Sequence, residues 1–391
     1  MLKGFSPKAF KNFALVTLAN FLFFCNFSSF FLLPLYIKDL GGTEADIGFI
    51  MGTFGITSLG AIPFVAFLVD KYGRRRFLII GYALMFVTSL SYLFVSDLSP
   101  LVYALRLLQG VSFAFSFTAA GTFVADYIPP QRRAEGLGIF SEFTIASYAI
   151  GPSLGEFLID LEGFRLFFLS ASFFSLVSLV LSLFAKDGTF ARSGDRFGLG
   201  FFKLIVSRKY LAVLSANVIL AGGLGAVLNF VAAYFTSKSL NAYYFFLTYT
   251  ITVVAVRVIG GRVSDSLGRM TIALPSMIVM SFALAAMALV HSPLTAVGVS
   301  FLFSFGYGFL YPTLSALIID NAQADERGKA MGAFNASYSM GINFLAFPLG
   351  VAARDFGYEG MYLSAAALVF AGFLLLVITR PGRHSCNEPL F

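Results

Sequence analysis

The chain has 391 residues, of which 58% are hydrophobic and only 12% charged, and its formal net charge is +7. A soluble globular domain carries roughly 25% charged residues, so this composition excludes a soluble protein. The two cysteines, Cys25 and Cys386, provide neither a disulfide framework nor a metal-binding pattern. The composition is that of an integral membrane protein.

Apolar segments long enough to cross a bilayer follow one another along the chain. A span needs about 20 mostly apolar residues, and lipid offers the backbone no hydrogen bonds, so each segment is predicted to be a helix. The stretches of alternating hydrophobicity that are typical of an outer-membrane barrel do not occur. The sequence predicts twelve spans, at about 12–36, 47–69, 76–96, 99–125, 134–158, 164–185, 210–235, 242–263, 270–290, 294–319, 329–352 and 360–379.

The positive charges predict the orientation of these spans. With both termini on the same side, 21 of the 27 Lys and Arg residues fall on the side of the termini and four on the other side. Because basic loops stay in the cytoplasm, both termini are predicted to be cytoplasmic, in a cytoplasmic membrane. The net charge is then explained by loop retention and anionic lipid, without a nucleic-acid partner.

The longest connection separates two sets of six spans. Residues 187–209 are rich in glycine and basic residues, and they predict a cytoplasmic linker between an N-terminal bundle at 1–186 and a C-terminal bundle at 210–391. Its second part mixes apolar and basic positions, as a helix lying on the membrane surface does. A simple tether and a regulatory segment both fit this pattern.

A short motif after the second span returns in the other half of the chain. The pattern Asp-x-x-Gly-Arg begins at Asp70 and again at Asp265, 195 positions later. Two loops repeat at almost the same offset, with Asp126 and Arg133 matching Asp320 and Arg327, 194 positions later. Two matches at one offset indicate an internal duplication. The residues of the first motif are Asp70, Gly73, Arg74 and Arg75, and those of the second are Gly261, Asp265, Gly268 and Arg269.

These motifs, together with Arg106-x-x-Gln109-Gly110 in the fourth span and Gly151-Pro152-x-x-Gly155 in the fifth, resemble the major facilitator superfamily, and within it the drug/proton antiporter branch. The resemblance covers essentially the whole chain. It implies two pseudo-symmetric six-helix bundles around a central cavity and secondary transport by alternating access. It also implies that the doubled motif stabilises a gate at the cytoplasmic side, with Asp126, Arg133, Asp320 and Arg327 forming matching inner-loop contacts.

Four charged residues lie within predicted spans, not counting the two outermost residues at each end of a span, and a charge inside a span costs roughly 2.5–3.5 kcal/mol on insertion scales. Arg106, Glu142, Glu156 and Arg257 are therefore candidates for handling substrate or protons, with Gln109 beside Arg106. Two of them have an alternative explanation. Arg257 can snorkel to the nearby surface, and Glu156 can be exposed at the mouth of the protein.

The fifth span is predicted to have two unlike faces. Glu142 and Glu156 are 14 positions apart, nearly four helical turns, so they share a face. Ser147, Gly151 and Gly155 lie on the opposite face, where small residues permit close helix packing, and Gly110 and Pro152 are further packing or bending positions.

Polar amides and the absence of histidine in the spans complete the candidate site. Either substrate contact or interhelical hydrogen bonding explains the amides Asn20, Asn26, Asn217, Asn229 and Asn343. Neither His291 nor His384 lies in a span, so a proton carrier must be a carboxylate. Glu142 is the leading candidate, with Arg106 expected nearby to adjust its proton affinity.

The function predicted from the sequence is secondary active transport, as proton-coupled export of small organic or lipophilic compounds. Uptake of a sugar, an organic acid or another metabolite by proton symport is the alternative, and a non-transporting membrane receptor or scaffold is a second one. An enzyme is not predicted, because the chain has no Gly-x4-Gly-Lys-[Ser/Thr] loop and no His/Cys cluster. We expect a small-molecule substrate and the lipid bilayer as partners, H+ as the coupling ion, no cofactor or metal, and a functional monomer.

Overall fold

The computed structural model describes residues 6–129, 132–187, 207–323 and 326–379, and within these ranges all regular structure is helical. The predicted linker at 187–209 and its amphipathic part lie almost entirely outside the described residues. The described chain divides into two compact units. Unit 1 comprises residues 1–42, 53–197 and 241–247, and unit 2 comprises residues 43–52, 198–240 and 248–391.

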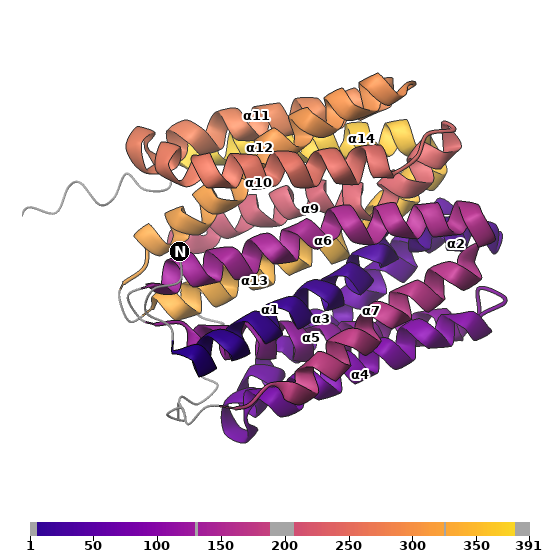
Figure 1. The fold of residues 1–391 in the computed structure, drawn as a ribbon. Helices are drawn as coiled ribbons and strands as arrows, with labels where there is room; N and C mark the ends of the chain where they lie inside the picture. Colours follow the sequence, from indigo (N-terminus) through magenta and orange to yellow (C-terminus); the bar gives the residue numbers. More distant parts are fainter. Residues whose placement is uncertain (1–5, 130–131, 188–206, 324–325, 380–391) are drawn as a thin grey trace, which may run out of the picture. The chain divides into compact units, whose positions relative to one another are not determined.

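The first half of the chain supplies the helices of unit 1, labelled in Figure 1. A Pro at the first turn and the Ser6 side chain begin the first helix, as expected for an N-terminal cap. The helices are α1 (Pro7–Ser29), α2 (Leu33–Asp39), α3 (Glu44–Tyr72), α4 (Arg74–Ser91), α5 (Pro100–Tyr127), α6 (Arg133–Glu162) and α7 (Phe164–Phe184).

The second half repeats this order, as Figure 1 also shows. Its helices are α9 (Arg208–Ser237), α10 (Tyr243–Leu267), α11 (Arg269–Ala286), α12 (Pro293–Asp320), α13 (Arg327–Phe344) and α14 (Ala346–Thr379). Gly357 has a φ of 74° and interrupts α14, so the part before it continues α13 and the part after it forms a separate segment.

Nine stretches of the described residues are long and apolar enough to cross a membrane, and one of them, Lys329–Thr379, is long enough for two crossings. Helices α6 and α10 are not among the nine, although their 30 and 25 residues are sufficient to span. Counting both crossings of Lys329–Thr379 together with α6 and α10 gives the twelve predicted spans.

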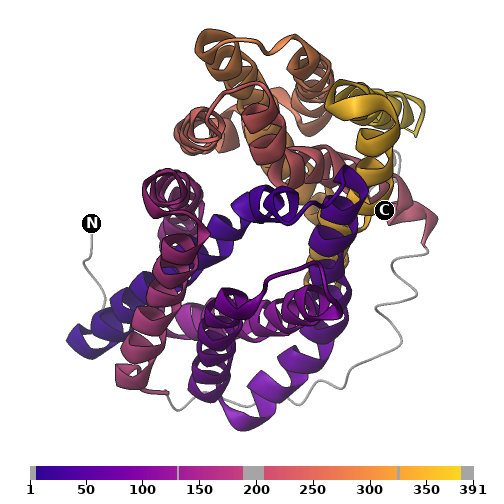
Figure 2. The same ribbon diagram turned by 90° about the vertical axis from the view of Figure 1, so that its right-hand side faces the viewer.

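The same helix pairs are in contact in both units, as expected for a duplicated chain. In unit 1, α1 packs on α6 and α7, and α4 packs on α5 and α7. In unit 2, α9 packs on α13 and α14, and α11 packs on α12 and α14. Figure 2 shows the helices nearly end-on. The predicted fold class, an all-helical membrane protein of two pseudo-symmetric six-helix bundles, is confirmed.

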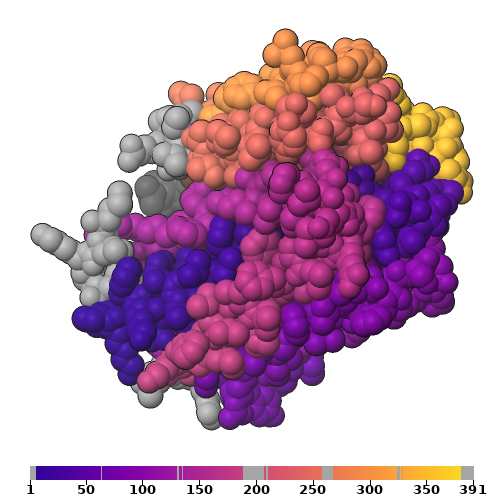
Figure 3. All heavy atoms as spheres, turned by 45° about the vertical axis from the view of Figure 1, so that its right-hand side comes forward, coloured from indigo at the N-terminus to yellow at the C-terminus, as the bar shows by residue number. Residues whose placement is uncertain are grey.

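Aromatic side chains fill the core of unit 1 and also cover its outer surface. Phe23, Tyr82 and Phe123 are buried in the core, where the Phe23 and Tyr82 rings lie 5.2 Å apart. Helix α7, seen as a diagonal band in Figure 3, instead presents Phe173 and Phe184 to the surroundings. An apolar outer surface of this kind is what a lipid environment requires.

Two helices contribute their first residues to the unit built by the other half of the chain. Residues 43–52 include the start of α3 and belong to unit 2, whereas residues 53–72 belong to unit 1. Residues 241–247 include the start of α10 and belong to unit 1, whereas the rest of α10 belongs to unit 2. These two segments are therefore the places where the predicted division of the chain and the observed division differ.

Candidate functional site

The doubled motif forms the same turn in both units. Gly73 joins α3 to α4 with a φ of 96°, and Gly268 joins α10 to α11 with a φ of 89°. Only glycine adopts this left-handed backbone without strain, which explains why both copies of the motif carry it at this position. We call the end of each unit that carries this turn the motif end, and the opposite end the far end.

An arginine that follows the turn pairs with the matching loop aspartate in each unit. In unit 1, the Arg74 Nε atom lies 2.8 Å from the Asp126 Oδ2 atom, and in unit 2 the Arg269 Nε atom lies 3.1 Å from the Asp320 Oδ2 atom. Arg74 also lies 3.6 Å from Asp70, one turn away. Each pair connects two helices of one unit, α4 with α5 and α11 with α12. The duplication therefore reproduces a specific ion pair as well as a sequence pattern.

Unit 1 holds its motif with one further carboxylate that the sequence did not indicate. Asp187 accepts a hydrogen bond of 3.0 Å from the Arg75 backbone N–H at the start of α4. The Arg75 side chain donates to the Leu183 carbonyl oxygen at 2.7 Å. Asp187 therefore caps α4, where a negative charge is favourable.

Two predicted inner-loop contacts are not formed within the described part of the chain. Arg133 and Arg327 are both exposed, at the first position of α6 and α13, and neither forms an ion pair with a described residue. Their aspartate partners bind the motif arginines instead. Gly261 and Asp265 lie in the part of α10 for which only the backbone is described.

Arg106 is buried in α5, at 5% exposure. Its Nη1 atom donates to the Gln109 Oε1 atom at 3.0 Å, and its guanidinium carbon lies 5.1 Å from the centre of the Phe54 ring. Gly110 permits this packing, because a Cβ atom there would lie 3.0 Å from the Ser58 backbone nitrogen and closer still to the Phe54 carbonyl oxygen. The residues of the Arg-x-x-Gln-Gly pattern thus pack together against α3.

Glu142 and Arg106 lie at different depths, contrary to the expectation that they are neighbours. Helices α5 and α6 meet at the motif end, between Tyr127 and Arg133. At 1.5 Å per residue, Arg106 is about 31 Å from that end and Glu142 about 14 Å. The separation of about 18 Å along the helices is too large for a direct ion pair. Glu142 itself is half-buried.

The small-residue face of α6 packs against α1, as predicted. The Ser28 Oγ atom donates to the Ser147 carbonyl oxygen at 2.9 Å, and the Ser29 Oγ atom donates to the Gly151 carbonyl oxygen at 3.2 Å. A Cβ atom on Gly155 would lie 2.9 Å from both the Leu32 and the Phe167 side chains. Pro152 lies within α6 without ending it.

Glu156 is not exposed at a mouth; it binds the start of another helix. Its side chain is 5% exposed. Its two carboxylate oxygens accept hydrogen bonds from the backbone N–H groups of Ala242, at 2.6 Å, and Tyr243, at 2.8 Å. Both groups lie at the N-terminus of α10, where unpaired N–H groups and the helix dipole favour an anion. Glu156 therefore attaches the first residues of α10 to unit 1.

The duplication places a second contact at the equivalent position of unit 2. At the offsets of 194 and 195, the counterparts of Glu156 and Tyr243 are Gly350 and Gly48. These two glycines touch, since a Cβ atom on Gly350 would lie 2.7 Å from the Gly48 Cα atom. Neither glycine was a candidate residue from the sequence, although the offset of the duplication relates Gly350 to Glu156.

Arg257 lies near the middle of α10, ten residues before its end at Leu267, rather than a turn or two from the surface. Its guanidinium carbon lies 5.3 Å from the centre of the Tyr311 ring. Tyr249, Tyr307 and Tyr338 lie near this group, and among the described residues Arg257 forms no hydrogen bond or ion pair. Snorkelling, one of the two readings of the sequence for Arg257, does not describe this environment.

Four of the five candidate amides form hydrogen bonds between helices. Asn20 donates to the Thr144 Oγ1 atom of α6 at 3.0 Å, and Asn26 donates to the Ala171 carbonyl oxygen of α7 at 2.6 Å. In unit 2, Asn217 and Asn229 donate to carbonyl oxygens of α13 at 2.8 Å and 3.1 Å. Asn343 bonds within its own helix. Of the two explanations, the structure supports hydrogen bonding between helices for four of the five.

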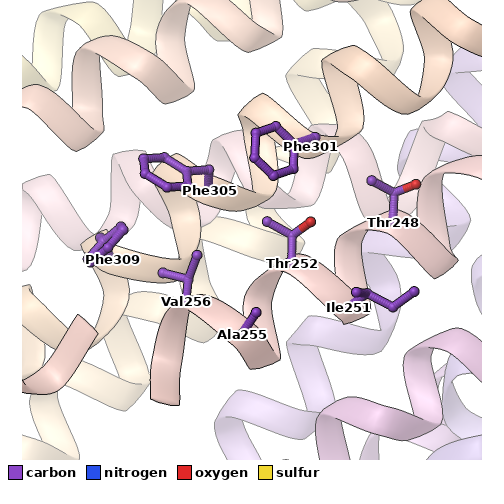
Figure 4. Close-up of a pocket in the computed structure, with 8 residues that line it drawn as sticks. All are labelled: Thr248, Ile251, Thr252, Ala255, Val256, Phe301, Phe305 and Phe309. Carbon is purple, nitrogen blue, oxygen red and sulfur yellow. The ribbon is translucent and has the colours of Figure 1, made fainter. Parts of the chain in front are cut away.

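An apolar groove of about 580 Å³ runs between α10 and α12, as Figure 4 shows. Three phenylalanines of α12 face one side of α10 across it, and the Thr248 and Thr252 hydroxyl groups are its polar lining. Ile251 is 67% exposed in this groove, which is typical of a lipid-facing surface. The lining residues are Thr248, Ile251, Thr252, Ala255, Val256, Phe301, Phe305 and Phe309.

Two helical bundles related by duplication, with ion pairs at matched positions and charged residues inside the spans, define a membrane transporter. The sequence matches the Major Facilitator Superfamily over residues 15–346 and, in a second match, 214–389. The chain belongs to this superfamily, and it is a multi-pass secondary transporter rather than an enzyme.

Curated relatives match along nearly the whole chain. An uncharacterized MFS-type transporter of Methanocaldococcus jannaschii is 24% identical over 346 residues, which covers 86% of this chain and 89% of the relative. The quinolone resistance protein NorA of Staphylococcus aureus is 22% identical over 377 residues, which covers 91% and 93%. The similarity to NorA agrees with the predicted resemblance to drug/proton antiporters.

Solved structures share the fold at lower identity. A variant of the nucleoside transporter NupG matches with a TM-score of 0.80 at 14% identity, covering 94% of this chain and 99% of that chain. The human organic anion transporter MFSD10 matches with a TM-score of 0.69 at 17% identity, covering 95% and 100%.

Proposed function

We propose that this transporter exports small organic, lipophilic compounds from the cytoplasm in exchange for protons. The observation that carries the proposal is the similarity to NorA over 91% of the chain, which includes the Gly151-Pro152-x-x-Gly155 helix. In this proposal the motif ends and both termini are cytoplasmic, and the protein acts as a monomer in the cytoplasmic membrane. The bias of 21 basic residues against four supports this orientation.

The matched contacts support a specific form of alternating access. The pairs Arg74–Asp126 and Arg269–Asp320 stabilise the motif end of each unit. At the far end, Glu156 holds the start of α10 in unit 1, and Gly350 packs on the start of α3 in unit 2. We infer that these two far-end contacts open and close during transport while the ion pairs keep each bundle rigid.

Glu142 is the residue we assign to proton transfer. It is half-buried in α6 on the face that also carries Glu156, and Glu156 already serves the start of α10. A carboxylate in a span is costly unless it is used or neutralised by protonation. Glu142 can therefore bind a proton and release it as the protein changes its conformation.

Proton movement in inside-out vesicles that contain the purified protein tests this function. A pH-sensitive dye reports an imposed proton gradient while lipophilic cations, lipophilic carboxylates, sugars and short organic acids are added in turn. We expect the lipophilic compounds to dissipate the gradient in the wild-type protein and Glu142→Gln to abolish this response. The matched control, Glu162→Gln, changes a carboxylate at the exposed end of the same helix and should respond like wild type.

A response to sugars or short organic acids alone would replace export by uptake through symport. A wild-type response that survives in Glu142→Gln would remove this residue from proton transfer.

A further inference from the structure

Among the described residues, Arg257 of α10 has no carboxylate as a counter-charge, which an arginine inside a span ordinarily has. Arg257 forms no ion pair with any described residue, and its Nε atom is buried without a hydrogen-bond partner. A guanidinium group has five N–H donors and no acceptor, so an incomplete environment is one that lacks acceptors. Arg74 and Arg269 are each paired with an aspartate, and Arg257 differs from these two motif arginines.

Tyrosines surround Arg257. Their hydroxyl groups can donate hydrogen bonds but carry no negative charge. The Tyr311 ring lies below the guanidinium group, and the Tyr307 and Tyr338 hydroxyl oxygens are 2.6 Å apart. Whichever of these two hydroxyl groups accepts that hydrogen bond keeps its own proton for a third group. The Tyr311 and Tyr338 rings meet edge to face, with their centres 4.9 Å apart. The cluster of Arg257, Tyr307, Tyr311 and Tyr338 thus provides several hydrogen-bond donors, which a single bound acceptor group can engage together.

The cluster faces away from the lipid-exposed side of α10. At 100° per residue, Thr248 and Ala255 of the apolar groove lie about 180° and 200° from Arg257 around the helix. Arg257, Tyr311 and Tyr338 are half-buried, whereas Tyr249 and Tyr307 behind them are buried. The donors are therefore placed inside unit 2 with part of their surface open, which is the arrangement that a ligand site needs.

We propose that the cluster of Arg257, Tyr307, Tyr311 and Tyr338 binds the anionic group of an organic substrate, and that a carboxylate is the group it fits best. A planar carboxylate accepts two hydrogen bonds from the fork of a guanidinium group, and a tyrosine hydroxyl donates a further one. The half-buried Tyr311 ring, which packs on the buried Phe334 ring at 5.6 Å, lies beside this site and provides an apolar surface for the rest of the molecule. This inference rests on the proposed function only in naming the bound anion a substrate.

Binding of radiolabelled 2-naphthoate tests the site without any need for transport. The full chain in nanodiscs of neutral phosphatidylcholine is compared by flow dialysis with empty nanodiscs, and 2-naphthamide serves as the uncharged isostere. We expect the wild-type protein to bind naphthoate at least about tenfold more tightly than naphthamide. Arg257→Gln should lose this preference, and Arg257→Lys should keep part of it, because a lysine retains the charge but not the fork.

Two further variants separate the site from general effects on charge and folding. Arg354→Gln removes an exposed arginine that is paired with Asp355 at 2.8 Å, and it should bind like wild type. Tyr338→Phe keeps the arginine and the ring but removes a hydroxyl donor, and it should weaken naphthoate binding several-fold even if Arg257→Gln does not fold. Equal binding of naphthoate and naphthamide by the wild-type protein, or undiminished naphthoate binding by both Arg257→Gln and Tyr338→Phe, would overturn the proposal.

A lipid headgroup is another source of an anionic group, and the nanodisc composition distinguishes the two. If phosphatidylglycerol in the nanodisc displaces naphthoate from the wild-type protein but not from Arg257→Lys, the site belongs to a lipid and the substrate assignment is wrong. Naphthoate binding that depends on Arg257 in a protein with no proton-coupled export would leave this site standing and remove the proposed function. Proton-coupled export by a protein without Arg257-dependent naphthoate binding would leave the proposed function standing and overturn this site.

Discussion

Replacement of Gly151 by valine is expected to remove most of the folded protein from the membrane. A Cβ atom at this position would lie 2.9 Å from the Ser29 backbone nitrogen, and closer still to the Ser28 Oγ atom and the Cys25 carbonyl oxygen. Two of these atoms belong to the backbone of α1 and cannot move aside without moving the helix. Overpacking of this kind typically costs 1–3 kcal/mol or more, which is a large share of the stability of most domains.

The measurement is the yield of monodisperse protein after extraction, together with its midpoint of thermal unfolding. Gly138→Val is the matched control, because Gly138 lies on the same helix with nothing within 4 Å of its added Cβ atom. We expect Gly138→Val to behave like the wild type. Wild-type yield and stability in Gly151→Val would show that α1 and α6 do not pack as described.

Replacement of Glu156 by alanine is expected to release the start of α10. Two backbone N–H groups lose their acceptor, and an unsatisfied buried donor costs about 1–3 kcal/mol. Amide hydrogen exchange at Ala242 and Tyr243 should therefore become faster by about tenfold or more. Transport should fall as well, because the far-end contact of unit 1 no longer closes.

Hydrogen exchange measured by mass spectrometry in nanodiscs provides the readout for this variant. Glu156→Gln retains one acceptor oxygen and should show an intermediate rate, whereas Glu162→Gln, at the exposed end of α6, should match the wild type. Unchanged protection of residues 241–247 in Glu156→Ala would mean that the carboxylate does not hold this segment.

Composition and span length predicted the helices, and the resemblance to the superfamily predicted their arrangement in two bundles. The twelve spans and the small-residue face of α6 both depend on local patterns, since a span needs a minimum length and close packing needs small side chains. The duplication was equally visible, because Asp126 and Asp320 stand at fixed distances from Arg74 and Arg269. The ion pairs observed between them make that repeat a physical contact.

The environment of each charged residue could not be predicted in the same way. Arg106 and Glu142 were expected to be neighbours because their charges are complementary, but the predicted spans already placed them about 29 Å and about 12 Å from the end where the two helices meet. Glu156 was assigned to a cavity or a mouth because its partners, the Ala242 and Tyr243 N–H groups, are backbone atoms that no side-chain pattern reveals. The tyrosines around Arg257 come from three helices, and only Tyr307 and Tyr311 have a helical spacing that suggests a common face.

The central claim is that the contact between α6 and the start of α10 opens in every transport cycle. A variant with cysteines at Asp160 of α6 and Asn241 before α10, whose side chains lie 3.5 Å apart, and with Cys25 and Cys386 replaced by alanine, can be bridged by a short bifunctional methanethiosulfonate reagent that dithiothreitol removes. Transport of a compound identified in the vesicle assay is then measured before bridging, after bridging and after reduction. The account predicts that bridging stops transport, that reduction restores it, and that each single-cysteine variant is insensitive to the reagent. Full transport by the bridged protein would contradict it.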